Sequence, residues 1–116
     1  MPTEVCVFCR IANGDSDAAI VYRDEQVIAF RDIRPVAPIH VLIVPIKHIA
    51  SLNDALPEDE TLLTHLLGVA RQVAVQEGVA AGGYRLVLNS GKNGGQSVFH
   101  LHVHLLGGRS MQWPPG

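Results

Sequence analysis

Hydrophobic residues recur at helical spacing through the middle of the chain, and this pattern predicts one long helix. Pro57 suits the first turn of the helix, and the acidic residues that follow it complement the positive end of the helix dipole. Gly78 suits its end, and His65 is expected to face solvent. The apolar positions at helical spacing are Leu62, Leu63, Leu66, Leu67, Ala70, Val73 and Ala74.

Shorter apolar runs predict a short N-terminal helix and five strands. The short helix is expected within residues 6–14, where Asn-Gly stops it. The order of hairpin, strand, helix and two strands favours an α+β fold, an antiparallel sheet with the long helix on one face and histidines on the other. The strands are expected at residues 19–23, 27–31, 41–44, 84–89 and 98–106.

Composition and charge narrow the class of protein. The 116 residues are 47% hydrophobic and 17% charged, which is typical of one compact domain. The formal net charge of −2, without a run of lysine and arginine, argues against a polynucleotide partner. Residues 1–5 lack a basic start, and no apolar stretch reaches the roughly 18 residues of a membrane span. We therefore expect a cytoplasmic protein without a signal peptide or membrane segment.

The strongest chemical signal is a row of histidines at alternate positions, His100, His102 and His104. On a strand, alternate side chains share one face and lie about 6.6 Å apart, from a rise of about 3.3 Å per residue. The intervening apolar residues would then enter the core. A polar strand face is the ordinary explanation for a single histidine, but three in alternation favour a site. Imidazoles in this arrangement suit a phosphate-sized ligand, as nucleophile or proton shuttle, or part of a metal site.

Two neighbouring features fit phosphate chemistry. Residues 91–97 form a glycine-rich loop of the kind that directs backbone N–H groups at an anion, although such glycines also serve tight turns. Ser97, at the end of the loop, is a plausible partner for a leaving group. His40 lies in an otherwise apolar strand, where a buried structural role is the usual one. It would reach the site only if its strand runs beside the histidine row.

Cys6 and Cys9 form a Cys-x-x-Cys pair, which is half of a zinc site. In the cytosol such cysteines are reduced or bound to metal. Two buried structural cysteines are the other interpretation. Zinc needs two more ligands, and His48 and one histidine of the row are available. A thioredoxin-like redox role is disfavoured because no β-α-β pattern surrounds the pair.

The chain resembles the histidine triad (HIT) superfamily, and within it the nucleotide-binding branch called HINT, along nearly its whole length. The resemblance implies a single HIT domain over residues 1–116 and a homodimer with a joined ten-stranded sheet. The C-terminal tail, residues 107–116 with Trp113, would reach the partner's site. The segments that carry the resemblance are residues 30–38, 40–45, 47–49, 94–109 and 113–116.

The resemblance also implies an activity, the hydrolysis of P–N bonds in purine nucleoside 5′-phosphoramidates, with aminoacyl-adenylates as a second candidate substrate class. His102 would attack the α-phosphorus and form a nucleotidyl-histidine intermediate, and water would then release the mononucleotide, such as AMP. His104, Asn89 and the backbone amides near Gly95 and Ser97 would hold the phosphate oxygens.

The remaining roles implied by the resemblance complete the site. Ser97 would also assist the departing amine, Gln96 would belong to the nucleotide-binding loop, and His40 would relay protons. Asp32 would bind the ribose hydroxyls. The nucleobase would lie against apolar residues that otherwise belong to the core, Phe8, Ile11, Phe30, Ile33 and Leu42. A structural zinc ion, not required for catalysis, would be held by Cys6, Cys9, His48 and His100.

Two other functions stay open at this point. A metal-dependent hydrolase could use the three histidines of the row as ligands, although no acidic residue lies within residues 100–109. A nucleotide-binding regulatory module would bind the same ligands with only incidental turnover. The two differ from the favoured interpretation in their response to a chelator and in their rate of turnover.

Overall fold

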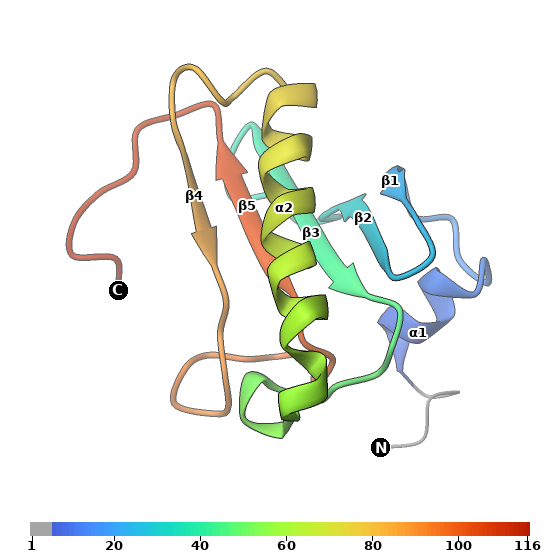
Figure 1. Ribbon diagram of the computed structural model, residues 1–116. Helices are drawn as coiled ribbons and strands as arrows, with labels where there is room; N and C mark the ends of the chain where they lie inside the picture. Colours follow the sequence, from blue (N-terminus) through green and yellow to red (C-terminus); the bar gives the residue numbers. More distant parts are fainter. Residues whose placement is uncertain (1–5) are drawn as a thin grey trace.

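The computed structural model describes residues 6–116 and has the expected α+β architecture, a five-stranded antiparallel sheet with one long helix across it (Figure 1). The strand order is β1-β2-β3-β5-β4. Residues 1–5, on which the expectation of no signal peptide was based, lie outside the described residues. Within residues 6–116 no helix is long and apolar enough to cross a membrane. The elements are α1 (Val7–Ala12), β1 (Ile20–Arg23), β2 (Val27–Arg31), β3 (Ile39–Pro45), α2 (Glu60–Gln76), β4 (Tyr84–Val87) and β5 (Val103–Gly107).

Helix α2 confirms the prediction from apolar periodicity. Its N-terminus is preceded by a single 3-10 turn over Pro57–Asp59. The side chain of Asp59 accepts hydrogen bonds from the Leu56 N–H and from the ammonium group of Lys47, so the entry to the helix is fixed by both partners. The apolar face of α2 is buried against the sheet through Leu62, Leu66, Val69, Ala70, Val73 and Ala74.

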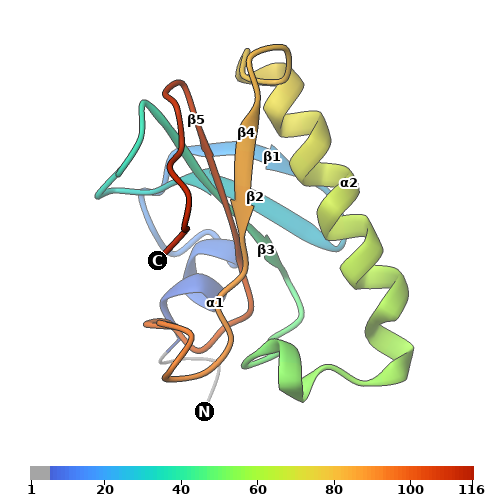
Figure 2. The same cartoon turned by 90° about the vertical axis from the view of Figure 1, so that its left-hand side faces the viewer.

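The centre of the sheet is covered on both faces, by α2 on one side and α1 on the other, as the alternating residues of β3 show (Figure 2). Val41 and Ile43 belong to the core beneath α2. Leu42 and Val44 point to the opposite face and pack with residues of α1. His104 of β5 pairs with Leu42 in the sheet register, so it lies on the α1 face. The prediction that the helix and the histidines take opposite faces is therefore confirmed.

The last strand is shorter than predicted. Residues 98–106 were expected to be a strand, but β5 begins at Val103, so His100 and His102 precede it. The reason is that other groups take the hydrogen bonds a longer ladder would use. The Leu101 N–H donates to the Ile49 carbonyl at 2.7 Å, and the His100 ring donates to the Pro45 carbonyl at 2.7 Å. Strand β4 likewise ends at Val87 instead of residue 89.

His65 of α2, which was expected to face solvent, is partly exposed and also has a polar partner. Its Nε2 lies 2.6 Å from Asp24 Oδ2, in the turn between β1 and β2. The same carboxylate accepts the Tyr22 hydroxyl and the N–H groups of Gln26 and Val27. Burial opposes ionisation of Asp24, but these four hydrogen bonds together hold its pKa well below the usual range. The cluster ties the β1–β2 hairpin to α2.

Candidate active site and metal centre

A pocket of about 610 Å³ opens on the α1 face of the sheet, with His102 and His104 in its wall. Its volume lies within the usual range for small-molecule sites. All five residues expected to contact a nucleobase line it, namely Phe8, Ile11, Phe30, Ile33 and Leu42. Asp32 and Ser97 line it as well. Sequence reasoning assigned no role to the other lining residues, Val7, Ser16, Asp17, Ala18, Arg31, Arg34 and Val98.

His102 has one ring nitrogen free to act as a nucleophile. Its Nδ1–H donates to the backbone carbonyl of His100 at 2.7 Å, which leaves the lone pair on Nε2. Burial lowers the pKa of His102, so the imidazole is neutral at neutral pH. The ring is also held edge-to-face against Phe8, with centroids 5.0 Å apart. The side chain is therefore both oriented and uncharged, with Nε2 unprotonated.

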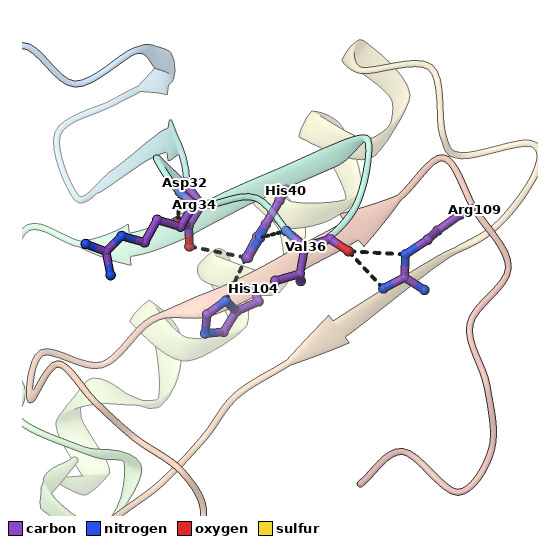
Figure 3. A network of polar contacts seen from close by, with 6 residues as sticks. All are labelled: Asp32, Arg34, Val36, His40, His104 and Arg109. Carbon is purple, nitrogen blue, oxygen red and sulfur yellow. Dashed lines mark hydrogen bonds and ion pairs between the residues drawn. The ribbon is translucent and has the colours of Figure 1, made fainter.

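His104, in the wall of the pocket, forms a hydrogen-bonded pair with His40 (Figure 3). The Val36 N–H donates to His40 Nδ1 at 3.2 Å, so the proton of the neutral His40 ring is on Nε2. This Nε2–H lies 3.0 Å from His104 Nδ1 and 3.4 Å from Asp32 Oδ2. His104 accepts at Nδ1 and therefore carries its own proton on Nε2.

The pKa values of this pair keep both rings neutral. Burial, and then the positive charges that His102 and His40 would carry, lower the pKa of His104 to about 4. Burial also lowers the pKa of His40, opposed by the carboxylate of Asp32. His104 Nε2–H is therefore a neutral hydrogen-bond donor at neutral pH. Strand β3 does run beside β5, which was the condition for His40 to reach the site.

The glycine-rich loop enters the site differently from the expectation. The Gly95 N–H donates to the Lys92 carbonyl within the loop, so this amide is already engaged. Gly94 lets the loop close tightly, because a Cβ there would lie 2.6 Å from the Ser90 carbonyl oxygen. Ser97 lines the pocket, but Gly95 does not.

Gln96 and Asn89 also lie outside the lining of the histidine pocket. Gln96 is buried, and its amide bonds to three backbone groups, the Gly91 N–H and the carbonyls of Ala50 and Val98. It braces the loop that presents Ser97. Asn89 lines a neighbouring hollow together with residues of the C-terminal tail.

Cys6, Cys9, His48 and His100 converge in a second cluster next to the pocket. The Cys6 sulfur lies 3.3 Å from His100 Nδ1, and the Cys9 sulfur lies 3.3 Å from His48 Nδ1. One potential ligand atom from each residue lies within 4.8 Å of the others. The His100 Nε2–H donates to the Pro45 carbonyl, so the Nδ1 lone pair faces the thiols.

The donor set and spacing of this cluster fit Zn²⁺. Two sulfurs and two imidazole nitrogens are a common tetrahedral zinc set, and Zn–S and Zn–N bonds imply S···N edges of about 3.6 Å. The observed contacts are of that size. Burial, and then a hydrogen bond with Cys6, raise the pKa of the Cys9 thiol to about 11. A bound dication would supply the positive charge that stabilises the thiolate.

The histidine row is therefore divided between two sites, and this bears on the metal-dependent alternative. His100 belongs to the cysteine cluster, whereas His102 and His104 line the pocket. Asp32, His40 and His104 also lie close enough to hold a cation. However, the Val36 N–H keeps the proton on His40 Nε2, and that nitrogen could bind a metal only if this hydrogen bond broke. The geometry favours proton transfer over metal ligation here.

Comparisons with known proteins agree with this geometry. The family model described as "Scavenger mRNA decapping enzyme C-term binding" matches residues 5–113. An uncharacterized HIT-like protein of Synechococcus elongatus is 49% identical over 114 residues, which cover 98% of this chain and 99% of that protein. The chain belongs to the histidine triad (HIT) family.

Solved structures of HIT proteins share the fold. A HIT family hydrolase from Legionella pneumophila has a TM-score of 0.93 and 53% identity, covering 96% of this chain and 99% of that one. A Zn-bound histidine triad family protein from Mycobacterium smegmatis has a TM-score of 0.78 and 32% identity, covering 93% and 78%. The HIT resemblance and the α+β fold expected from the sequence are confirmed.

Proposed function

We propose that this HIT protein is a nucleotide-binding hydrolase of the HINT type, which cleaves the P–N bond of purine nucleoside 5′-phosphoramidates. The hydrolase name of its Legionella relative and its family membership support the broader class. The proposed reaction type rests on the state of His102, which is a buried neutral imidazole with a free Nε2 on the wall of a nucleotide-sized pocket.

The proposed reaction has two displacements at phosphorus. His102 Nε2 attacks the α-phosphorus and forms a P–N bond, while the bond to the substrate's amine breaks and the amine takes up a proton from solvent as it leaves. Water then attacks the same phosphorus and gives up a proton to solvent, the P–Nε2 bond breaks, and the mononucleotide is released. The attacking ring becomes cationic, and the His100 carbonyl that accepts its Nδ1–H stabilises that charge.

Two groups of the pocket would assist these steps. His104 Nε2–H would donate to a phosphate oxygen, and His40 would hold His104 in that state through its own Nε2–H. Ser97 would hydrogen-bond the phosphate or the departing amine. Gly95 lies outside the pocket lining, so in this proposal it contributes only through the loop that Ser97 ends, and Asn89 lines the neighbouring hollow instead.

The nucleoside would occupy the apolar part of the pocket. Asp32 Oδ1 accepts the Arg34 N–H, and its carboxylate is partly exposed, so further lone pairs are available to ribose hydroxyls. The buried rings of Phe8 and Phe30, which pack edge-to-face, offer apolar surface for a purine. Aminoacyl-adenylates, which share the nucleotide part, are a second proposed substrate class.

We also propose that Cys6, Cys9, His48 and His100 hold a structural zinc ion. Such an ion would join α1 to the segments that follow β3 and precede β5, and it would brace the backbone that orients His102. The proposal is supported by the fit of the donor set. No step of the reaction requires the ion.

The proposal extends to a homodimer in the cytoplasm. Leu67 and Val75 of α2 are more than half exposed, and β4 is an edge strand of the sheet. Pairing of α2 and β4 between two copies would cover these groups and join the sheets into ten strands. Residues 107–116, with Trp113 82% exposed, would then lie on the partner. A monomer by light scattering at micromolar concentration would contradict this assembly.

Release of mononucleotide from adenosine 5′-phosphoramidate, with EDTA present, tests the function. The wild type should turn over, and His102→Ala should lose roughly 10³-fold or more of the rate. His65→Gln, a histidine variant outside the pocket, is the matched control and should retain turnover. Tight nucleotide binding without turnover in a folded wild type would favour the regulatory module. Activity abolished by EDTA would favour metal-dependent hydrolysis.

A further inference from the structure

Arg109 holds a backbone carbonyl of the loop that lies beside the pocket (Figure 3). Its Nε and Nη2 donate to the Val36 carbonyl oxygen at 3.2 and 3.0 Å. Its Nη1 donates to the Ser110 carbonyl at 3.1 Å and approaches the Met111 sulfur at 3.4 Å. The guanidinium thus joins the chain after β5 to the loop between β2 and β3.

Val36 is held at both of its backbone polar groups. Its carbonyl accepts from Arg109, and its N–H donates to His40 Nδ1. Its side chain is 61% exposed, so packing of that side chain contributes little to its position. The two hydrogen bonds are therefore the contacts that keep Val36 aligned on the His40 ring.

The chain after β5 lies close against the loop between β2 and β3, and this places Arg109 within hydrogen-bonding distance of that loop. Gly108 has a φ of +88°, and a Cβ on it would lie 2.8 Å from the Pro38 Cβ. The chain after β5 therefore packs directly on the loop that carries Val36. The next residue, Arg109, is then placed over the carbonyl of that loop.

We propose that Arg109 is a positioning residue of the reaction, which acts through Val36 to keep the proton of His40 on Nε2. The arginine fixes the Val36 carbonyl, the Val36 N–H faces His40 Nδ1, and His40 Nε2–H faces His104 Nδ1. His104 thereby presents its own Nε2–H as a donor. The effect on turnover rests on the proposed function, whereas the effect on the His40 tautomer does not.

Without Arg109, the Val36 carbonyl would lose the hydrogen bonds that fix it. Once Val36 is free to turn, the His40 proton can move to Nδ1, and Nε2 becomes an acceptor. His104 then donates from Nδ1 to His40 and loses its Nε2–H. One such hydrogen bond lost at the transition state corresponds to roughly tenfold in rate.

Long-range ¹H–¹⁵N NMR of the imidazoles, at about pH 7.5 where rings of lowered pKa are neutral, tests the proposal directly. The wild type should show His40 with its proton on Nε2. Arg109→Met should shift the population toward the Nδ1 tautomer, and Arg109→Lys, which keeps a donor, should shift it less. Arg85→Met is the matched control, because Arg85 also donates to a backbone carbonyl, that of Gln112. It should leave the His40 tautomer unchanged.

A second measurement separates this proposal from the proposed function. With adenosine 5′-phosphoramidate, Arg109→Met should lower kcat roughly tenfold with little change in KM. If the wild type is inactive, the proposed function fails, but the NMR comparison still decides the role of Arg109. Arg109 is exposed, so the variant should remain folded, which thermal unfolding checks. A folded Arg109→Met protein with the wild-type His40 tautomer overturns the proposal.

Discussion

Replacing His104 by glutamine should make the folding stability less sensitive to acid. The pKa of His104 is about 4 in the folded protein, against an ordinary 6.5, through burial and then the neighbouring His102 and His40. Below pH 6.5 the unfolded chain binds a proton at this position that the folded protein refuses until about pH 4. Stability is therefore complete above pH 6.5 and falls as the pH drops toward 4.

These two pKa values set the size of the effect. At about pH 5, proton uptake by the unfolded chain at His104 removes about 2 kcal/mol of stability relative to pH 7.5, and the full loss is about 3 kcal/mol. Glutamine does not titrate, so the variant lacks this part of the acid sensitivity. The other buried histidines remain and give both proteins a common background.

Urea unfolding of the wild type and His104→Gln at about pH 7.5 and pH 5 measures the difference. Between these conditions the wild type should lose about 2 kcal/mol more than the variant. A single metal condition is used for both proteins, so protonation of the cysteine–histidine cluster cancels in the comparison. His104→Asn, a second neutral replacement, should behave like His104→Gln. Equal losses in the wild type and both variants would show that proton uptake at His104 does not contribute to the acid sensitivity.

Three further perturbations test other parts of the molecule. Metal analysis of freshly purified protein from zinc-supplied cells should find about one zinc ion per wild-type chain and far less in Cys9→Ser. A zinc content below about half an equivalent in the wild type would reject the proposed zinc site. Asp24→Ala removes the acceptor of four hydrogen bonds and should destabilise the fold by roughly 1–3 kcal/mol in urea unfolding. Gly108→Ala adds a Cβ against Pro38 at a φ of +88° and should lower stability by roughly 1–3 kcal/mol. Gly82→Ala, which meets only open space, should not, and equal effects would contradict the steric argument.

The periodicity of hydrophobic residues along the sequence was sufficient to predict most of the fold. Helix α2 was predictable because one face is continuously apolar, and β3 because its residues are buried on both sides. The start of β5 was not predictable. It depends on hydrogen bonds from His100 and Leu101 to the carbonyls of Pro45 and Ile49, which are distant in sequence.

Those parts of the site that depend on a particular side-chain type were predictable from the sequence. Those parts that depend on backbone groups were less predictable. The imidazoles of the row and the cysteine pair were identifiable because few other side chains can act as nucleophiles, transfer protons or bind metal at neutral pH. The engaged amide of Gly95 and the bracing role of Gln96 depend on how the loop closes. The link from Arg109 through Val36 joins a side chain to a carbonyl and an N–H. Every residue except proline carries such an N–H, so no sequence signal marked Val36.

The stereochemical course at phosphorus distinguishes nucleophilic catalysis by His102 from direct attack by water. A nucleoside 5′-phosphoramidothioate of one configuration at phosphorus, hydrolysed in ¹⁸O-labelled water, yields a product whose configuration reports the number of displacements. Attack by His102 followed by attack by water inverts the configuration at phosphorus twice, so net retention is expected. Net inversion would show a single direct attack by water and would contradict a nucleotidyl-histidine intermediate.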